Sequence, residues 1–335
     1  MKKQALCLLI GVCTLSVILL PALSSAAPVY ENKTVTIVVG YGPGGGYDRM
    51  ARLLAKHLPK YIPGKPNFVV ENMPGADSMI AANHIFNIVK PDGLTLGTFN
   101  RGIPIGQLLK APGVKFDITK FSWIGSAATE ATVLATLTSL PYKTYDELVK
   151  SKQLVNLGSM GPSDSSGQFP MMLQEYAGLN LKMIIYPSSS DCMLAVERKE
   201  LDGRGGSYSS LKPFVDRGLV RCLVRGSVSD PEIDNLPMDE DLTTNKMGKT
   251  VMAMRSSTDR IGRPYVMPPK TPAEAVNIMR EAFEKVATDP ELKADATKML
   301  MDVKYVNAEE TLKILNTLLS QPEEIVKEFA KFVKF

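Results

Sequence analysis

The sequence predicts an α/β protein of two lobes, with parallel or mixed sheets, flanking helices and a clamshell-like hinge. Apolar β-branched runs alternate with amphipathic helical patterns, as in parallel sheets with helical crossovers. A second series of this kind starts after residue 126, and the last helices have few strands of their own. We therefore expect residues 27–126 and 253–335 to form lobe 1 and residues 127–252 to form lobe 2. Two crossings between lobes are typical of a hinge.

The elements expected in lobe 1 begin with Thr34–Val39, a continuous β-branched run typical of a buried parallel strand. Near the other end of the chain, Thr271, Pro272 and Glu274 form a helix-start pattern with Thr271 as the expected N-cap. The remaining patterns predict strands at Phe68–Val70 and Leu94–Phe99, and helices at Arg49–Leu58, Met79–Val89 and Pro322–Phe332. The helix that Thr271 caps is expected to run to about Ala287, and another helix is expected to start at Asp289.

The elements expected in lobe 2 form a second alternating series. Ser122–Ala135 is apolar and rich in small residues, so we expect one strand that leaves lobe 1 there. The short apolar run Val251–Met254 is expected to return as a strand. Between them the patterns predict strands at Leu154–Gly158, Leu181–Ile185 and Leu219–Val224, and helices at Tyr145–Lys150, Gln168–Ala177 and Asp191–Arg198.

The first 26 residues have the pattern of a cleavable signal peptide. Lys2 and Lys3 precede an apolar run, Ala5–Leu20, that is too short for a comfortable membrane span. Pro21 ends the run, and small residues up to Ala27 follow. Cleavage after Ala26 is expected to release the mature chain into the periplasm, and no convincing lipobox surrounds Cys13.

The charge and cysteine content narrow the class of protein further. Removal of Lys2 and Lys3 lowers the formal net charge from +4 to +2, and no basic stripe with interleaved aromatic residues is present. We therefore expect no nucleic-acid partner. The mature chain keeps Cys192 and Cys222. The sequence leaves open whether they form a disulfide or stay as two thiols, because a bridge depends on their separation in space.

Six loops at the expected carboxyl ends of strands are rich in glycine, serine or proline. Ligands of open parallel sheets bind beyond those ends. Glycines admit close backbone approach, and loops that feed helix N-termini offer free N–H groups to an anion. Ordinary turns have the same composition, so one such loop is weak evidence for a site. Six such loops together favour a binding cleft. The loops are residues 42–46, 72–76, 100–102, 159–166, 186–190 and 203–207.

The first of these loops also contains a formal dinucleotide-binding pattern. Gly40, Gly42 and Gly45 have the G-x-G-x-x-G spacing, and Glu71 ends the next strand. An NAD(P)-binding oxidoreductase is therefore an alternative. Pro43 opposes it, because proline removes a backbone N–H from the expected phosphate cradle. Export from the cytoplasm also opposes it.

Three segments together resemble the Bug-type receptors of tripartite tricarboxylate transporters. They are Tyr41–Asp48, similar to the family's PGGxxD loop, Glu71–Ala76, similar to ENxPGA, and Pro91–Leu96, similar to PDGxTL. The resemblance implies a type II periplasmic binding protein that binds carboxylates through backbone N–H groups of the first two loops and ordered water. It also implies delivery of the solute to a membrane permease.

The candidate ligand residues combine this resemblance with the residue chemistry. The resemblance assigns residues 44–48 and 72–76 to the proximal carboxylate, with Asp48 favoured as an N-cap. The resemblance thins after about residue 160. Two departures from the family pattern are Asp77, where a glycine is usual, and the segment after Ile185, which lacks the family's lysine. Arg101 and Arg204 could each bind a second carboxylate in a bidentate manner. The alternative is that each is exposed to solvent or bonded to carbonyls that close the lobes. The candidates are Tyr41, Gly44, Gly45, Gly46, Asp48, Asn72, Pro74, Gly75, Ala76, Arg101, Ser163, Ser165, Ser166, Tyr186, Ser188, Arg204 and Ser207.

Catalytic and metal-binding patterns are not evident in the sequence. Gly158–Gly161 does not fit a nucleophile elbow, and His57 and His84 have no evident acid or nucleophile beside them. We expect a non-enzymatic, monomeric solute receptor without cofactor or metal that delivers a small carboxylate to a permease. A receptor that signals to a sensor kinase remains an alternative.

Overall fold

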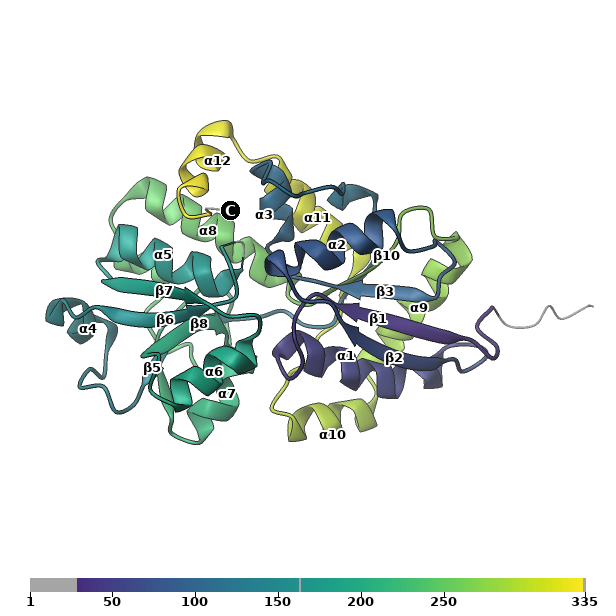
Figure 1. Cartoon of the computed structure of the whole chain (residues 1–335), viewed down its shortest axis with the longest axis horizontal. Coiled ribbons are helices and arrows are strands. Elements are labelled where there is room, and N and C mark those ends of the chain that lie inside the picture. Colours follow the sequence, from purple (N-terminus) through teal and green to yellow (C-terminus); the bar gives the residue numbers. More distant parts are fainter. Residues whose placement is uncertain (1–28, 163, 334–335) are drawn as a thin grey trace, which may run out of the picture.

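The computed structural model describes residues 29–162 and 164–333. The predicted signal peptide therefore lies outside the described residues. Within them, the chain forms two mixed sheets, each in a lobe of its own, and the lobes lie side by side (Figure 1). The predicted two-lobe α/β architecture is confirmed.

The sheet of lobe 1 has the strand order β11-β4-β10-β3-β1-β2. β1 pairs in parallel with β2 and β3, whereas β10 runs antiparallel to β3 and β4, and β11 runs antiparallel to β4. The predicted parallel core of this lobe is therefore correct, with an antiparallel half added. The strands are β1 (Thr34–Val39), β2 (Asn67–Asn72), β3 (Thr95–Thr98), β4 (Ser122–Ser126), β10 (Pro264–Met267) and β11 (Val306–Asn307).

Helices cover both faces of this sheet. α1 and α9 share one apolar cluster with Val35, Ile37 and Val39 of β1. α2 and α11 belong to the opposite cluster, together with Val38 and Trp123. The helical elements are α1 (Gly46–His57), η1 (Leu58–Tyr61), η2 (Ala76–Ser78), α2 (Met79–Asn87), α3 (Ile103–Leu108), η3 (Ile118–Lys120), α9 (Ala273–Ala287), α10 (Pro290–Lys298) and α11 (Ala308–Leu319).

The sheet of lobe 2 has the order β7-β6-β8-β5-β9. β6 pairs in parallel with β7 and β8, and β5 runs antiparallel to β8 and β9. Its strands are β5 (Thr132–Leu137), β6 (Val155–Ser159), β7 (Leu181–Ile185), β8 (Gly203–Ser207) and β9 (Val220–Arg225). Its helices are α4 (Tyr145–Ser151), α5 (Ser165–Ala177), α6 (Ser189–Glu197), α7 (Tyr208–Asp216), η4 (Asp239–Leu242) and α8 (Lys246–Ile261).

Two strands that were predicted where the chain crosses between the lobes are wrong. The run Ser122–Ala135 is two strands, β4 and β5, which belong to different sheets. The run Val251–Met254 lies inside helix α8, which begins after the N-cap Asn245. A short apolar run fits a buried strand or one turn of a buried helix equally well, so periodicity alone could not distinguish them.

The segment 203–207, predicted as a loop, is strand β8 at the centre of the lobe 2 sheet. Its glycines allow close packing from both sides. A Cβ at Gly203 would lie 2.1 Å from the Ala135 carbonyl oxygen, and one at Gly205 would lie 2.8 Å from Pro170 of α5. Close backbone approach therefore explains why a strand carries so many glycines.

The last helix, α12 (Glu323–Ala330), packs against α8 above lobe 2 (Figure 1). We expected the C-terminal helices to cover lobe 1, as α9, α10 and α11 do. Phe329, Phe332 and Val333 instead join the apolar cluster of Leu157 and Phe169. The C-terminal helices therefore pack on both lobes. The predicted residue boundaries between the lobes stay a prediction.

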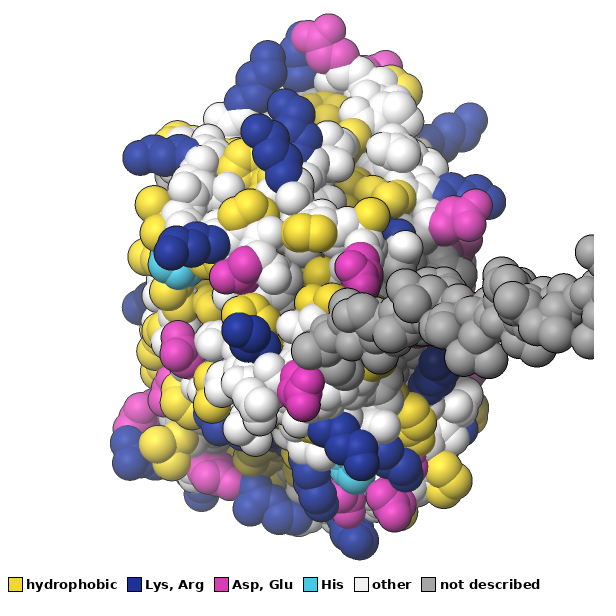
Figure 2. All heavy atoms as spheres, turned by 90° about the vertical axis from the view of Figure 1, so that its right-hand side faces the viewer, with side chains coloured by type: hydrophobic (Ala, Val, Ile, Leu, Met, Phe, Trp, Pro, Cys, Tyr) yellow, Lys and Arg dark blue, Asp and Glu magenta, His cyan; other side chains and the backbone are white. Residues whose placement is uncertain are grey.

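The face of the molecule shown in Figure 2 has mixed charges. On the side of lobe 1 shown in Figure 2, Lys and Arg side chains lie among Asp and Glu side chains without a continuous basic patch. Among the described residues, no helix is both long and apolar enough to cross a membrane.

Candidate functional site

The glycine loop between β1 and α1 faces the N-terminus of α6 in lobe 2. A Cβ at Gly42 would lie 3.3 Å from the Ser188 Cβ, and one at Gly45 would lie 3.0 Å from the Ser189 Oγ. Ser190 Oγ donates a hydrogen bond to the Pro43 carbonyl at 2.9 Å. The two lobes therefore touch at this loop, and a side chain at Gly42 or Gly45 would be tightly packed against lobe 2.

Asp48 and Asn72 hold the glycine loop in place. The Asp48 carboxylate accepts hydrogen bonds from the Gly44 N–H at 2.8 Å and the Asn72 amide at 3.0 Å, and it pairs with Arg52 at 2.9 Å. Asn72 also donates to the Tyr41 carbonyl at 2.9 Å. Burial acts to raise the pKa of Asp48, but these hydrogen bonds hold it below its usual value.

The N-cap predicted at Asp48 is wrong, because Gly45 occupies that position. Asp48 is the third residue of α1, and its carboxylate reaches back past the N-cap to the Gly44 N–H of the loop. The N-cap predicted at Thr271 is displaced as well. α9 begins at Ala273 after Pro272, and the Thr271 hydroxyl bonds to the Pro268 carbonyl at 2.8 Å.

A small inner cavity of about 20 Å³ lies beside the glycine loop, and residues of both lobes line it. This volume is the size of one water molecule. Helices α5 and α6 both begin at its wall, at Ser165 and Ser189. The lining residues are Tyr41, Gly45, Gly46, Tyr47, Arg101, Met160, Asp164, Ser165, Ser189, Arg204, Ser207, Ser210 and Arg263.

Two of the three arginines around this cavity are paired with carboxylates. Arg101 Nη2 lies 2.9 Å from Asp259, and its other donors bond to Ser207, Thr132 and Ser165 at 2.9–3.1 Å. Arg263 Nε lies 2.5 Å from Glu130. Burial acts to lower the pKa of Arg101, but Asp259 raises it above its usual value. Both guanidinium groups therefore have structural partners.

Arg204 differs from these two arginines. Its side chain is 1% exposed, and among the described residues no carboxylate pairs with it. Its Nε donates to the Gly205 carbonyl at 2.8 Å and its Nη1 to the Ser189 carbonyl at 3.2 Å. The guanidinium lies over Gly206, where a Cβ would be 2.4 Å from Nη2. The lining of the inner cavity thus includes a buried positive charge that only neutral oxygens contact.

Tyr41 separates the inner cavity from a second, outer cavity. Its hydroxyl lies 2.8 Å from Asp164 Oδ2 in lobe 2 and 3.0 Å from Asp77 Oδ1 in lobe 1. Tyr41 and Met160 line both cavities, which are therefore neighbours. Burial, Asp164 and Asp77 raise the pKa of Tyr41 well above its usual value, so the hydroxyl keeps its proton.

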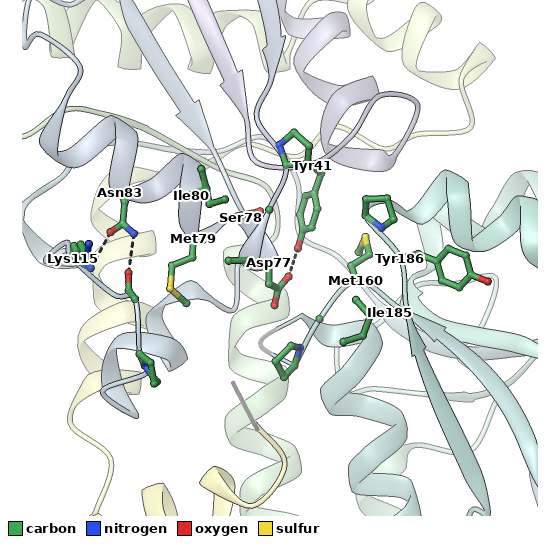
Figure 3. Close-up of a pocket in the computed structure, with 18 residues that line it drawn as sticks. Tyr41, Asp77, Ser78, Met79, Ile80, Asn83, Lys115, Met160, Ile185 and Tyr186 are labelled. Atoms are coloured by element: carbon green, nitrogen blue, oxygen red, sulfur yellow. Dashed lines mark hydrogen bonds between the residues drawn. The ribbon is translucent and has the colours of Figure 1, made fainter.

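The outer cavity has a volume of about 880 Å³ and is mostly apolar (Figure 3). Both lobes contribute to it, through the segments around Ser78 and Tyr186. Its wall is formed by Tyr41, Pro74, Gly75, Ala76, Asp77, Ser78, Met79, Ile80, Asn83, Pro112, Gly113, Lys115, Met160, Gly161, Pro162, Ile185, Tyr186 and Pro187.

Most of the predicted ligand residues lie at these cavities. Tyr41, Gly45, Gly46, Arg101, Ser165, Arg204 and Ser207 line the inner one, and Tyr41, Pro74, Gly75, Ala76 and Tyr186 line the outer one. Gly44 lines a third cavity, of about 350 Å³. Asp48, Asn72, Ser166 and Ser188 line none of the three and bond to loop or helix ends instead. Ser163 lies outside the described residues.

Sequence reasoning missed several residues of the cleft. Asp164 and Ser189 stand within loops that we expected at the site, but neither was chosen as a ligand residue. Arg263 follows Gly262 in the segment that enters β10. Nothing in the local sequence marks Arg263 as part of the cleft, because its place depends on the packing of both lobes.

The two cysteines are free thiols. Cys192 packs on β6, where a Cβ at Gly158 would lie 3.0 Å from its Sγ, whereas Cys222 is in β9. Strands β8 and β5 stand between β6 and β9, a width of roughly 14 Å. Of the two alternatives that the sequence left open, the structure therefore has the two separate thiols. Burial raises the pKa of Cys192 to about 11 and that of Cys222 to about 12.

One group of side chains has the composition of a metal site. The ligand atoms of His57, Asp289 and Glu291 lie within 4.8 Å of one another. Lys60 Nζ already contacts this group, 3.0 Å from Asp289 and 3.5 Å from Glu291. Its ammonium supplies the positive charge that a metal would bring.

The fold and the cleft define the class of protein as a two-lobe α/β binding protein whose candidate site lies between the lobes. Residues 50–330 match the family described as tripartite tricarboxylate transporter family receptor. The chain belongs to this family, and the resemblance seen in its loops is confirmed.

Similarity to individual proteins agrees with this assignment. The chain is 25% identical to a UPF0065 protein of Bordetella pertussis over 279 residues, 82% of each chain. Among solved structures, the periplasmic binding protein BugD matches with a TM-score of 0.74 at 19% identity, over 91% of this chain and 99% of that one. Rpa4515 of R. palustris, solved with adipate, matches with a TM-score of 0.73 at 18% identity, over 89% and 97%. These two matches show the same fold.

Proposed function

We propose that this protein is an extracytoplasmic receptor that captures a small organic carboxylate between its lobes. It then presents the solute to the membrane permease of a tripartite tricarboxylate-type transporter. Membership of the receptor family supports the role, and the solved relative with adipate supports the class of solute. The pattern of residues 1–26 supports export through a cleavable signal peptide. We expect the receptor to act as a monomer.

Arg204 is the observation that carries this proposal. A buried charge is costly unless an opposite charge compensates it. Arg204 is 1% exposed, lies on the wall of the inner cavity and has bonds to two carbonyls only. A solute carboxylate would supply the missing charge through charge-assisted hydrogen bonds.

Helix α6 favours the same ligand charge. It begins at the cavity wall, so the positive end of its dipole faces the cavity, whereas the Asp164 carboxylate already caps α5 there. Gly45 and Gly46 of lobe 1 form the opposite wall. A carboxylate between these surfaces would contact both lobes at once and would stabilise the closed arrangement by differential binding.

The oxidoreductase alternative is not favoured by this geometry. Ser188, Ser189 and Ser190 cover the glycine loop on the side where a dinucleotide phosphate would lie. The loop's close contacts are thus with lobe 2, as expected for a receptor that closes on a small solute.

The proposal is tested by thermal unfolding of the mature protein against mono-, di- and tricarboxylates, amino acids, aromatic acids and NAD. A solute at about 100 times its Kd should stabilise the fold by roughly 2.7 kcal/mol. We expect stabilisation by one or more carboxylates. Stabilisation by NAD alone would reject the receptor function.

Arg204→Met is the matching variant, because methionine keeps an unbranched side chain and removes the charge. Affinity for the solute should fall at least about tenfold, since hydrogen bonds to charged groups contribute roughly 1.5–3 kcal/mol. Without solute the variant should be at least as stable as the wild type, because the uncompensated charge is gone. Arg198→Met, at an exposed position of the same lobe, is the control. Equal solute affinity in the two variants would contradict the role of Arg204.

A further inference from the structure

We propose that the preferred solute is a monocarboxylate with a long, unbranched apolar chain, and that this chain lies in the outer cavity. The inference rests on the proposed function, in which the solute carboxylate binds Arg204, and it assigns the class of solute. Its basis is the contrast between the inner cavity, whose wall includes serines and arginines, and the outer cavity, which is mostly apolar.

The inner cavity suits one small charged group. Its volume is only about 20 Å³, and Arg101 and Arg263 on its wall already pair with carboxylates, whereas Arg204 contacts only carbonyl oxygens. The rest of a solute bound there has to extend beyond this cavity. Tyr41 and Met160 line both the inner and the outer cavity, so the outer one can receive the rest of the solute.

The third cavity also adjoins the inner one, because the start of α6 lines both. Its volume of about 350 Å³ is less than half the 880 Å³ of the outer cavity. Two cations lie on its wall, and both already bond to the protein: Arg49 donates to the Met299 carbonyl, and Lys298 pairs with Asp295 at 3.3 Å. A smaller volume and a charged wall suit a long apolar chain less well than the outer cavity does.

Tyr41 stands at the boundary between the inner and outer cavities. Its hydroxyl lies 3.0 Å from Asp77 of lobe 1 and 2.8 Å from Asp164 of lobe 2. When the lobes move apart, the Tyr41–Asp164 hydrogen bond breaks and the two cavities become continuous. A solute can then lie across the boundary with its carboxylate at Arg204. A second carboxylate at the boundary would meet two acidic side chains, whereas a methylene group has no charge for them to repel.

The outer cavity supplies a place for the chain. Met79 and Ile80 of lobe 1 and Met160 and Ile185 of lobe 2 form part of its wall. Ile80 is 50% exposed and Ile185 is 68% exposed, although both are large and apolar. Figure 3 shows them at the cavity from opposite lobes. An apolar chain between them would remove both from water, which favours binding and closure of the lobes.

Two polar side chains on the wall of the outer cavity already bond to the protein. Ser78 Oγ donates to the Gly40 carbonyl at 3.0 Å. The Asn83 amide donates to the Gly113 carbonyl at 2.8 Å, and its oxygen accepts the Lys115 N–H at 2.9 Å (Figure 3). A second carboxylate at the far end of the solute would therefore lose its water for few new hydrogen bonds, which is unfavourable.

Lys115 is the one cation among the described residues on this wall, and it is exposed to solvent. Figure 3 shows it beside Asn83, away from Tyr41 and Tyr186. An exposed ion pair contributes little, because water screens both charges. A pair with Lys115 would therefore not offset the cost of a second charge in the cavity.

The first test compares four acids by calorimetry with the mature protein. Butanoate, hexanoate and octanoate differ only in chain length, and adipate has the length of hexanoate with a carboxylate at each end. Each added methylene should raise the affinity about twofold to fourfold, as expected for burial of apolar surface. Hexanoate should bind at least about tenfold more tightly than adipate, because its far end brings no charge into the apolar cavity.

Ile185→Ser tests the wall of the outer cavity. The affinity for octanoate should fall at least about threefold, because the chain loses apolar surface to pack against, and the loss should be smaller for butanoate. Ile88→Ser is the matched control. Ile88 is 70% exposed and is not among the described residues that line this cavity. Its replacement should leave the affinity for all four acids unchanged.

The outcomes separate the two proposals. If adipate binds as tightly as hexanoate or more tightly, the monocarboxylate inference is overturned and the carboxylate receptor stands. The same holds if affinity does not rise from butanoate to octanoate, or if Lys115→Met removes an advantage of adipate. Unchanged octanoate affinity in Ile185→Ser would overturn the placement of the chain. If no carboxylate of any class binds the wild type, both proposals are overturned.

Discussion

Two buried arginines in one cleft have different chemistry because their partners differ. Arg101 has four hydrogen-bonded contacts to side chains of Thr132, Ser165, Ser207 and Asp259. Arg204 has two, both to carbonyl oxygens. Arg101 therefore serves to hold the structure, whereas Arg204 is the arginine that we propose to bind the solute carboxylate. Residue type alone could not distinguish them.

Replacement of Arg101 by glutamine is expected to destabilise the protein strongly. Arg101 links the Asn100–Gly102 segment of lobe 1 to Asp259 and to two serines of lobe 2. Loss of one partner of a buried ion pair costs about 3–5 kcal/mol. Urea unfolding should show a loss of this size for Arg101→Gln and almost none for the exposed Arg198→Gln. A loss below about 1 kcal/mol would contradict the structural role.

The glycine loop shows which parts of a site are predictable at the scale of a residue. Its glycines stand out because a Cβ at Gly42 or Gly45 would be tightly packed against Ser188 and Ser189, and one at Gly46 would lie 2.4 Å from the Ser210 Oγ. A position that needs a residue without a side chain can be recognised as glycine in the local sequence. The partners of Arg101 are 31–158 residues away along the chain. Contacts over that range depend on tertiary packing and leave no local pattern.

At the scale of elements, strands and helices with clear periodicity were predictable. β1 and β7 have the predicted bounds, and α2 and α4 differ from the prediction only at their last residues. The errors fall where tertiary contacts outweigh local preference. Strand β8 contains three glycines yet lies between β6 and β5, because α5 and β5 approach its backbone closely.

The start of α10 provides a test of electrostatics at this scale. Asp289 caps the helix and accepts hydrogen bonds from Tyr61 at 2.8 Å and Lys60 at 3.0 Å. Burial acts to raise the pKa of Asp289, but these bonds lower it to about 2. A carboxyl with a lowered pKa stabilises the folded state above its unfolded pKa and loses this effect as the pH falls through the folded value.

Asp289→Asn should therefore lower the free energy of unfolding at neutral pH by about 1 kcal/mol, because the charge is lost while the capping oxygen remains. The difference from wild type should shrink as the pH falls from about 4 towards about 2, where the wild-type carboxylate is protonated. Denaturant unfolding across this range measures it. Asp146→Asn, in an exposed pair with Lys150, should show almost no difference at any pH. A constant deficit for Asp289→Asn would contradict the electrostatic explanation.

At the scale of the whole molecule, two lobes were predictable, but their contact was not. The alternation of elements and the final helices indicated two sheets and a hinge. The interaction of Tyr41, Pro43 and Arg101 with lobe 2 is carried by side chains and carbonyls that lie far apart in sequence. Closure is a property of surface complementarity between lobes, which periodicity does not encode.

The Tyr41 hydroxyl is expected to stabilise the closed arrangement before solute binds. Tyr41→Phe removes the hydroxyl that both Asp77 and Asp164 contact and leaves these two carboxylates facing each other across the lobes. Hydrogen bonds to charged groups contribute roughly 1.5–3 kcal/mol, so the open form should gain about tenfold or more in population relative to the closed form. Small-angle X-ray scattering of the solute-free variant should show a larger radius of gyration.

Tyr61→Phe is the matched control for this measurement. It removes a tyrosine hydroxyl that also bonds to a carboxylate, Asp289, but both residues belong to lobe 1. This control should lose stability without a change in the radius of gyration, because no contact between lobes is affected. Tyr41→Phe with the dimensions of the wild type would show that the lobes stay together without this hydroxyl. The boundary between the two cavities would then have to open through other contacts, such as the one from Ser190 to Pro43.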